Sequence, residues 1–181
     1  MNKIYGQDLY RYYGGKMPMS ERLLPPPNIL YIKTLRLAQH YRKHNKLLYI
    51  YYKLKLKRLQ HRTSIQIPEE VEIGPGFYIG HYGSIVINPK AILGKNINIA
   101  NGVTIGQENR GKRIGVPTIS DNVWIGTNAT VIGKITIGND VLIAPNSYVN
   151  FDVPDHSIVI GNPARIIPRE NATEGYINRT I

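Results

Sequence analysis

One histidine stands apart in the middle of the chain. His81 lies in the stretch Ile79–Asn88, IGHYGSIVIN, among small, β-branched and amide residues, and no Asp or Glu lies within eight residues on either side of it. An imidazole can be neutral at pH 7 and accept a proton from a hydroxyl group, so His81 is a candidate general base. It is also open to a plainer interpretation, as an exposed polar residue without a chemical role. The elements that position it must decide between the two.

Composition excludes several kinds of site. The chain has no cysteine, which rules out disulfides, thiolate metal sites and a cysteine nucleophile. Its 181 residues favour one main domain with a short appendage. The first thirty residues have no signal-peptide pattern, and no apolar run approaches the roughly 18 to 20 residues that span a bilayer. We therefore expect a cytoplasmic protein.

The positive charge is concentrated in one segment. The formal net charge is +11, and residues 28–63 contain ten Lys or Arg and no acid. Apolar residues recur there at helical spacing, first after Asn28 and again after Asn45, which predicts two basic amphipathic helices following a lead that ends in three prolines. These helices either cap the main domain or contact an anionic membrane or a phosphate-bearing acceptor. No recognition motif accompanies the charge, so we expect no nucleic-acid partner.

From Ile65 onward the sequence has a period of six. Eleven hexads begin with an aliphatic residue that a small or amide residue usually follows: IPEEVE, IGPGFY, IGHYGS, INPKAI, LGKNIN, IANGVT, ISDNVW, IGTNAT, VIGKIT, IGNDVL and IAPNSY. Three hexads can form one triangular coil of about 18 residues with the aliphatic residues inside. The pattern predicts a parallel β-helix over residues 64–167. Its two ends need covers. The basic helices of the N-terminal segment, residues 1–63, are candidates for one end, and the non-repeating tail, residues 168–181, is the candidate for the other.

The repeat is interrupted twice. Two extra residues, Ile85 and Val86, precede the hexad INPKAI, and a longer interruption comes later. Residues 107–118, QENRGKRIGVPT, do not fit the hexads, and the aliphatic register resumes at Ile119. We therefore expect an extruded loop over these residues, a usual location for function on a regular framework.

These motifs resemble those of the left-handed β-helix acyltransferases. The resemblance covers about residues 65–167 and is nearest to the serine acetyltransferases and their relatives that O-acetylate capsular and other surface polysaccharides. It implies a mainly β protein, a left-handed parallel β-helix of hexapeptide repeats with a short N-terminal helical segment. It also implies a homotrimer that binds acetyl-CoA between subunits, with His81 as general base. The motifs that carry it are the hexads, the run from His81 to Ile87, GVTIG at 102–106, DNVWIG at 121–126 and GNPARI at 161–166.

Departures from the serine enzymes bear on the acceptor. Where those enzymes orient the base with an aspartate this chain has Gln66, whose amide could take that role, as could Glu69 or Glu70. A glutamate and a substrate-holding histidine of those enzymes are replaced by Pro89 and Val116. We therefore expect a carbohydrate acceptor in surface polysaccharide biosynthesis. Serine O-acetylation and a trimeric scaffold without activity are the alternatives.

The resemblance also implies a coenzyme site and no metal. A γ-class carbonic anhydrase shares the fold but needs three zinc-binding histidines, and the repeat region has only His81 and His156. The expected location is the cytoplasm, with possible peripheral contact at the inner face of the membrane through residues 28–63. The residues expected to bind the coenzyme are Gly106, Lys112, Arg113, Trp124, Gly126, Thr127, Asn146 and Arg165.

Overall fold

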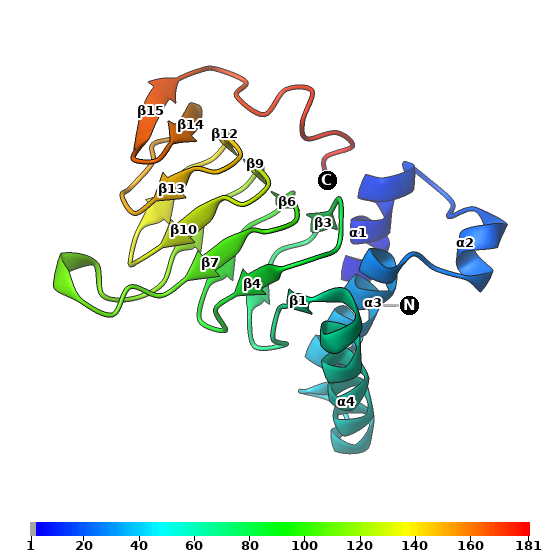
Figure 1. Cartoon of the computed structure of the whole chain (residues 1–181). Helices are drawn as coiled ribbons and strands as arrows, with labels where there is room; N and C mark the ends of the chain where they lie inside the picture. Colours follow the sequence, from blue (N-terminus) through cyan, green and yellow to red (C-terminus); the bar gives the residue numbers. More distant parts are fainter. Residues whose placement is uncertain (1–2) are drawn as a thin grey trace.

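A computed structural model describes residues 3–181. Within this range helices precede a three-sided stack of β-strands, the prism (Figure 1). No helix of the described residues is long and apolar enough to cross a membrane. Asn45 caps the helix that leads into the prism, because its side chain accepts a hydrogen bond from the Leu48 N–H at 3.0 Å. The helices are α1 (Lys3–Tyr13), α2 (Met19–Leu23), α3 (Pro27–Tyr41) and α4 (Lys46–Thr63).

Three parallel sheets form the sides of the prism. The first joins β1, β4, β7, β10 and β13, and the second joins β2, β5, β8 and β11. The third joins the parallel strands β3, β6, β9, β12 and β14 and ends with β15, which is antiparallel to β14. The bounds are β1 (Ile65–Gln66), β2 (Glu72–Ile73), β3 (Tyr78–Ile79), β4 (Ile85–Ile87), β5 (Ile92–Leu93), β6 (Asn98–Ile99), β7 (Thr104–Gly106), β8 (Thr118–Ile119), β9 (Val123–Ile125), β10 (Thr130–Ile132), β11 (Thr136–Ile137), β12 (Val141–Ile143), β13 (Tyr148–Val149), β14 (Ser157–Gly161) and β15 (Ala164–Pro168).

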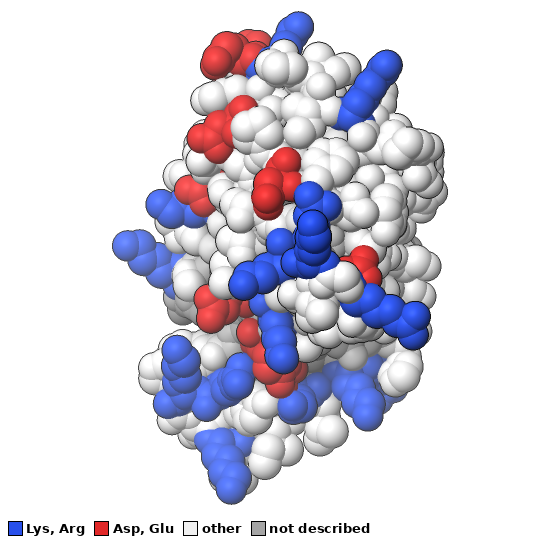
Figure 2. Space-filling model, turned by 90° about the vertical axis from the view of Figure 1, so that its left-hand side faces the viewer, with Lys and Arg blue, Asp and Glu red and all other residues white. Residues whose placement is uncertain are grey.

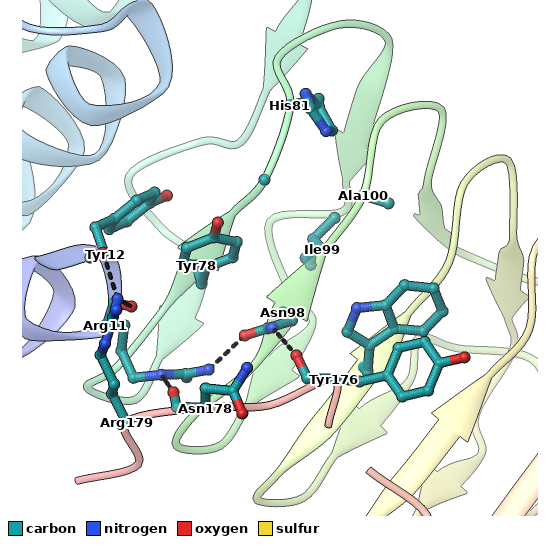
Figure 3. A pocket seen from close by; sticks show the side chains of 12 residues that line it. Arg11, Tyr12, Tyr78, His81, Asn98, Ile99, Ala100, Tyr176, Asn178 and Arg179 are labelled. Atoms are coloured by element: carbon teal, nitrogen blue, oxygen red, sulfur yellow. Dashed lines mark hydrogen bonds between the residues drawn. The ribbon is translucent and has the colours of Figure 1, made fainter. Parts of the chain in front are cut away.

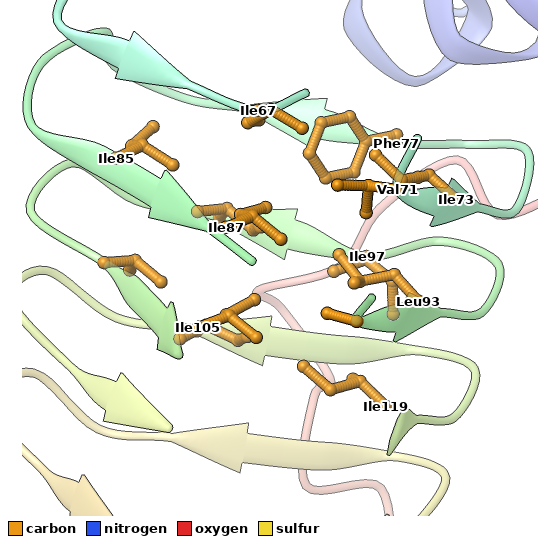
Figure 4. Close-up of a cluster of buried hydrophobic side chains, with 14 of the residues drawn as sticks. Ile67, Val71, Ile73, Phe77, Ile85, Ile87, Leu93, Ile97, Ile105 and Ile119 are labelled. Carbon is orange, nitrogen blue, oxygen red and sulfur yellow. The ribbon is translucent and has the colours of Figure 1, made fainter. Parts of the chain in front are cut away.

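The register of the strands confirms the predicted β-helix. Thr130 pairs with Tyr148 one coil later, at the expected spacing of eighteen residues. Aliphatic side chains of the hexads stack inside the prism, where Ile67, Ile87 and Ile105 are almost completely buried (Figure 4). Their burial stabilises each coil only against its neighbours, so the first coil needs a partner on its open side.

Side chains of α1 and α3 supply that partner. The Tyr31 hydroxyl accepts a hydrogen bond from the N–H of Ile67 and donates one to its carbonyl oxygen, both at 3.0 Å. The Tyr12 hydroxyl does the same for Ile79, with both bonds at 2.8 Å. Each hydroxyl therefore satisfies the open edge of a strand as a neighbouring strand would.

A buried ion pair completes this cap. The Arg36 guanidinium donates to the Asp8 carboxylate at 2.8 Å, and both side chains are at most 2% exposed. Arg36 also donates to the carbonyl oxygens of Ile73 and Gly74, while Asp8 accepts from the Phe77 N–H. The helix α1 itself lies in the lead, where the sequence pattern did not predict one.

The extruded loop leaves the prism between the first and second sheets. Residues 107–117 contain a short 3₁₀ helix (Gly111–Arg113), and Glu108 pairs with Gly115 across the base of the loop. Thr118 already belongs to β8, where it pairs with Ile92, so the predicted loop is one residue too long. The regular coil resumes there because the Thr118 N–H donates to the Ile135 carbonyl of the next coil.

The C-terminal tail takes a different path from the one predicted. Strand β15 folds back antiparallel on β14 at the far end of the third sheet. The tail then runs along the outside of that sheet to α1, instead of covering the end of the prism (Figure 1). The expected end cover was therefore wrong. The physical reason is that Trp124, Leu142 and Ile158 form an apolar outer face, against which Ala172 packs.

Candidate active site

His81 lies on the prism edge where the third sheet passes into the first. It follows β3, precedes β4, and has an exposed side chain. It borders a cavity of about 460 Å³ between this edge, α1 and the tail (Figure 3). The residues that line the cavity are Arg11, Tyr12, Tyr78, Gly80, His81, Asn98, Ile99, Ala100, Trp124, Tyr176, Asn178 and Arg179.

Side chains of the helices α1 and α3 hold the backbone just before His81 through hydrogen bonds. Besides the two bonds with Tyr12, the Ile79 carbonyl accepts one from the Asn28 side chain at 2.8 Å. The Tyr12 ring stacks on Tyr78 with the ring centres 4.3 Å apart. Burial raises the pKa of Tyr12 well above its ordinary value, which keeps its hydroxyl protonated and able to donate.

Two of the expected coenzyme residues lie farther along the same edge as His81. The Asn146 N–H donates to the Thr127 carbonyl at 2.9 Å, and the Thr127 hydroxyl donates to the Asn101 side-chain oxygen at 3.3 Å. Trp124 lies in β9 on the neighbouring outer face, with its ring centre 4.9 Å from that of Tyr176. The edge thus presents a row of polar groups leading away from the imidazole.

Gly126 also lies on this edge, and coil packing accounts for it. A Cβ atom there would lie 2.7 Å from the Pro145 backbone nitrogen and 2.8 Å from the Trp124 ring. Close packing of adjacent coils therefore requires a glycine at this position, whether or not a ligand approaches it.

The other expected coenzyme residues lie elsewhere on the subunit. Three of them, Gly106, Lys112 and Arg113, lie at the edge between the first and second sheets. Lys112 and Arg113 line a separate hollow of about 330 Å³ there. The Arg113 guanidinium donates to the Asn150 carbonyl at 2.6 Å. Arg165 is exposed in β15 at the far end of the prism. One subunit does not bring the loop cations to its own His81.

The residues considered as partners of His81 do not contact it. Gln66 pairs with Val86 in the first sheet, and within residues 3–181 no hydrogen bond joins it to His81. Glu69 accepts from Tyr49 at 2.8 Å and pairs with Lys53 at 2.7 Å. Burial alone would raise the pKa of Glu69, but the bonds from Lys53 and Tyr49 lower it overall. Glu70 lies 3.8 Å from Lys53, so both acids face α4.

Sequence reasoning missed the contribution of the chain ends to this cavity. The buried Arg11 donates to the Asn98 side chain at 2.7 Å and to the Asn178 carbonyl at 2.8 Å. Asn98 in turn donates to the Tyr176 carbonyl at 3.0 Å (Figure 3). The tyrosine-rich lead was the one visible signal, because contacts between residues more than 160 positions apart leave no periodic pattern.

No metal cluster accompanies these groups in the described part of the chain. Over residues 3–181, no set of three or more His, Cys, Asp or Glu side chains is arranged to hold a metal ion. The side chains that line the cavity present an imidazole, aromatic rings, amides and guanidinium groups.

Comparisons with known proteins fit this geometry. Residues 117–150 match the family model described as bacterial transferase hexapeptide (six repeats). A solved serine acetyltransferase from Neisseria gonorrhoeae, in complex with serine, is 31% identical with a TM-score of 0.73, over 91% of this chain and 68% of that one. The chain belongs to the hexapeptide-repeat transferase family.

Two further members of the hexapeptide-repeat transferase family are similar to it. Serine acetyltransferase 2 of Arabidopsis thaliana is 37% identical over 77% of this chain and 44% of its own length. A Brucella abortus serine acetyltransferase solved in complex with coenzyme A is 28% identical with a TM-score of 0.75, over 93% of this chain and 66% of that one. The chain spans less than half the length of the first curated relatives that it matches.

Proposed function

We propose that this protein transfers the acetyl group of acetyl-CoA to a hydroxyl group, with His81 as the general base. The observation that carries the proposal is the position of His81, exposed at a cavity and at the start of an edge that continues through Thr127 and Asn146. Similar proteins support it, because they are named serine acetyltransferases and one is solved with coenzyme A.

The proposed step needs one proton acceptor. Neutral His81 takes the proton of the acceptor hydroxyl while the hydroxyl oxygen attacks the thioester carbonyl carbon. The C–S bond then breaks, and the imidazolium returns the proton to the departing sulfur, so that an ester and a free thiol are formed. Tyr12 and Asn28 hold the backbone of Ile79, and this limits the movement of the base two residues later.

The groups along the edge suit the donor. Thr127 and Asn146 offer a hydroxyl and an exposed amide to the amide groups of a pantetheine arm. Arg165, exposed at the far end of the prism, offers a guanidinium to phosphate. We propose these three residues as coenzyme contacts, and Gly126 as a packing residue between them.

Serine is the first acceptor to test. The similar proteins named above are serine acetyltransferases, and one is solved in complex with serine. A carbohydrate hydroxyl is the second candidate, which the cavity favours for one reason. The rings of Tyr12, Tyr78, Trp124 and Tyr176 line it, and aromatic faces suit the apolar faces of a sugar ring.

We further propose a cytoplasmic homotrimer. In such a trimer we expect the extruded loop of a neighbouring subunit to bring its Lys112 and Arg113 to the His81 edge, although these cations lie at a different edge of their own subunit. The cytoplasm is where acetyl-CoA is available to such an enzyme.

Thiol release from acetyl-CoA tests the reaction class and the base together. The full chain and His81→Ala are compared with L-serine, and with a panel of sugars and oligosaccharides. We expect turnover by the wild type and a loss of about 10²- to 10⁴-fold in His81→Ala, with coenzyme affinity nearly unchanged.

The acceptor panel separates the remaining alternatives. Release with serine alone identifies a serine acetyltransferase, and release with a glycan alone identifies a carbohydrate acetyltransferase. No release with any acceptor and no coenzyme binding would overturn the proposal in favour of a scaffold protein. Full activity of His81→Ala would overturn the assignment of the base.

A further inference from the structure

The outer face of α4 is apolar and has no partner in the described chain. Leu56, Leu59 and Thr63 are buried on the inner face of the helix. The opposite face carries Leu47 at 80% exposure, Tyr51 at 56% and Leu54 at 64%. These residues recur at spacings of three and four, so they lie together along one side of the helix. A helix that is apolar on both sides while only one is covered has a second surface to bury.

The same face is basic along its second half. The sequence of α4, KLLYIYYKLKLKRLQHRT, contains six Lys or Arg residues and no acid. Lys53 is paired with Glu69, and Lys57, Arg58 and Arg62 are exposed. In Figure 2 the lower end of the molecule, where Figure 1 places α3 and α4, shows Lys and Arg side chains separated by uncharged surface.

A hollow on this side combines both kinds of group. It measures about 440 Å³ and its floor is apolar, formed by Leu30, Leu59 and neighbouring side chains. Three cations, Lys55, Arg58 and Arg62, line it as well. Apolar contact beside clustered positive charge suits an amphiphile with an anionic head.

We propose that the outer face of α4 binds the surface of an anionic lipid bilayer. The helix would lie in the plane of the interface, with Leu47, Tyr51 and Leu54 among the acyl chains and the cations at the lipid phosphates. This orientation covers the exposed leucines and neutralises the charge in a single contact. It does not depend on the acetyl transfer proposed above.

Two other occupants fit the surface less well. A second copy packed on this face would bring a second set of the same cations, Lys57, Arg58 and Arg62, to the interface, and α4 has no acid to pair with them. A nucleic acid would neutralise the cations but leave the leucines exposed to water. An anionic bilayer satisfies both sets of residues.

Vesicle sedimentation tests the proposal with the full-length protein. The probes are vesicles of phosphatidylglycerol mixed with phosphatidylcholine, and vesicles of phosphatidylcholine alone, at low and high salt. We expect binding to the anionic vesicles at low salt and at least about tenfold weaker binding to neutral vesicles. Lack of binding to the anionic vesicles at low salt would overturn the proposal.

Matched variants locate the contact. K57E/R58E should lower binding at least about tenfold, because each basic residue near an anionic surface contributes on the order of a factor of five or more. K90E/K134E makes the same change of charge on the prism and should bind like the wild type, because both lysines are exposed and neither belongs to α4 or lines the hollow beside it. Equal loss in the two variants would show only a general charge effect and would overturn the assignment to α4.

A third variant tests the apolar half and the competing occupant. L47S/L54S should also lose vesicle binding while it keeps the molar mass of the wild type in lipid-free solution. A fall in molar mass would show that the face is a contact between subunits, and would overturn the proposal.

Discussion

The two glycines expected at the coenzyme site, Gly126 and Gly106, differ in the atoms that a side chain would meet there. This difference distinguishes a glycine required by coil packing from one that packing does not require. A Cβ on Gly126 would lie 2.7 Å from a backbone nitrogen of the next coil, whereas one on Gly106 would lie 3.2 Å from a methyl group of Ile132. A methyl group can move aside, but the backbone of a packed coil cannot. The two expected coenzyme glycines are therefore not equivalent.

Gly126→Ala should destabilise the protein by about 1–3 kcal/mol, because overpacking forces adjacent coils apart. Gly106→Ala is the matched control, and its loss should be clearly smaller. The free energies of unfolding in urea measure both. Equal stability of the two variants would contradict the packing role of Gly126.

At the same scale, residue type and the family resemblance marked His81 as a candidate base but could not show its surroundings. Residue type and spacing were enough to mark an imidazole without a nearby acid. Gln66 was a candidate because the serine enzymes have an aspartate at this position, and Glu69 and Glu70 were the alternatives. In the structure both glutamates face α4 through Lys53. The repeat shows at which edge of the prism a residue lies, but not which side chains of α4, outside the repeat, contact it.

Among the elements, the helical cap stabilises the prism through polar side chains rather than through an apolar face alone. Asp8 and Arg36 form a buried pair at 2.8 Å that also binds backbone groups of the first coil. Removing one partner of such a pair leaves a buried charge without compensation.

Asp8→Ala should lower the free energy of unfolding by about 3–5 kcal/mol. Glu70→Ala is the control, since its partly exposed pairing with Lys53 at 3.8 Å contributes at most about 1 kcal/mol. Chemical denaturation followed by circular dichroism gives both values. If Asp8→Ala were as stable as Glu70→Ala, the cap would not depend on this pair.

The tail is held to the prism by a carboxylate that senses pH. Asp140 accepts hydrogen bonds from the N–H groups of Ala172 and Thr173 at 3.0 Å, and from the Thr173 hydroxyl at 2.6 Å. Its partner His156 lies 2.9 Å away. Burial alone would raise the pKa of Asp140, but the bonds from Thr173 and His156 bring it below 3.8 overall. Asp140 itself raises the pKa of His156 above 6.5.

Docking of the tail on the prism should therefore be strongest at pH values between the lowered pKa of Asp140 and the raised pKa of His156. The Asp140 contribution is present above pH 3.8 and is lost as the pH falls through the lowered pKa. The His156 contribution is complete below pH 6.5 and is lost as the pH rises through the raised pKa. Fluorescence of Trp124, the single tryptophan, against which Tyr176 packs, reports the change. H156Q should remove only the loss at high pH; an unchanged profile would contradict the role of His156.

For the whole molecule, the hexads predicted most of the fold, because each repeat is satisfied locally by the coil beside it. The prism, its interior and the position of the loop all follow from that period. The path of the tail and the helix α1 do not, because Arg11, Asn98 and Asn178 come together from distant parts of the chain. Pairings of this kind depend on the shape of the folded surface, and no local sequence pattern predicts them.

The proposed trimer predicts that two impaired variants, one in the base and one in the loop, can restore each other. In mixed trimers of H81A with K112A/R113A, about a quarter of random interfaces pair an intact His81 with an intact neighbouring loop. Turnover after refolding the mixture should rise well above that of either variant alone. Unmixed variants refolded separately are the control, and no gain in the mixture would mean that the loop does not serve a neighbouring subunit.

The hydroxyl groups of Tyr12 and Tyr31 have one more consequence. A coil that ends in unpaired strand edges is a template on which another prism can add, and repeated addition would give a fibre. Each of these tyrosine hydroxyls donates one hydrogen bond to the first coil and accepts one from it. Unlike a strand, a side chain has no second row of backbone groups with which a further chain could pair. The helical segment thus keeps further prisms from adding at this end of the stack.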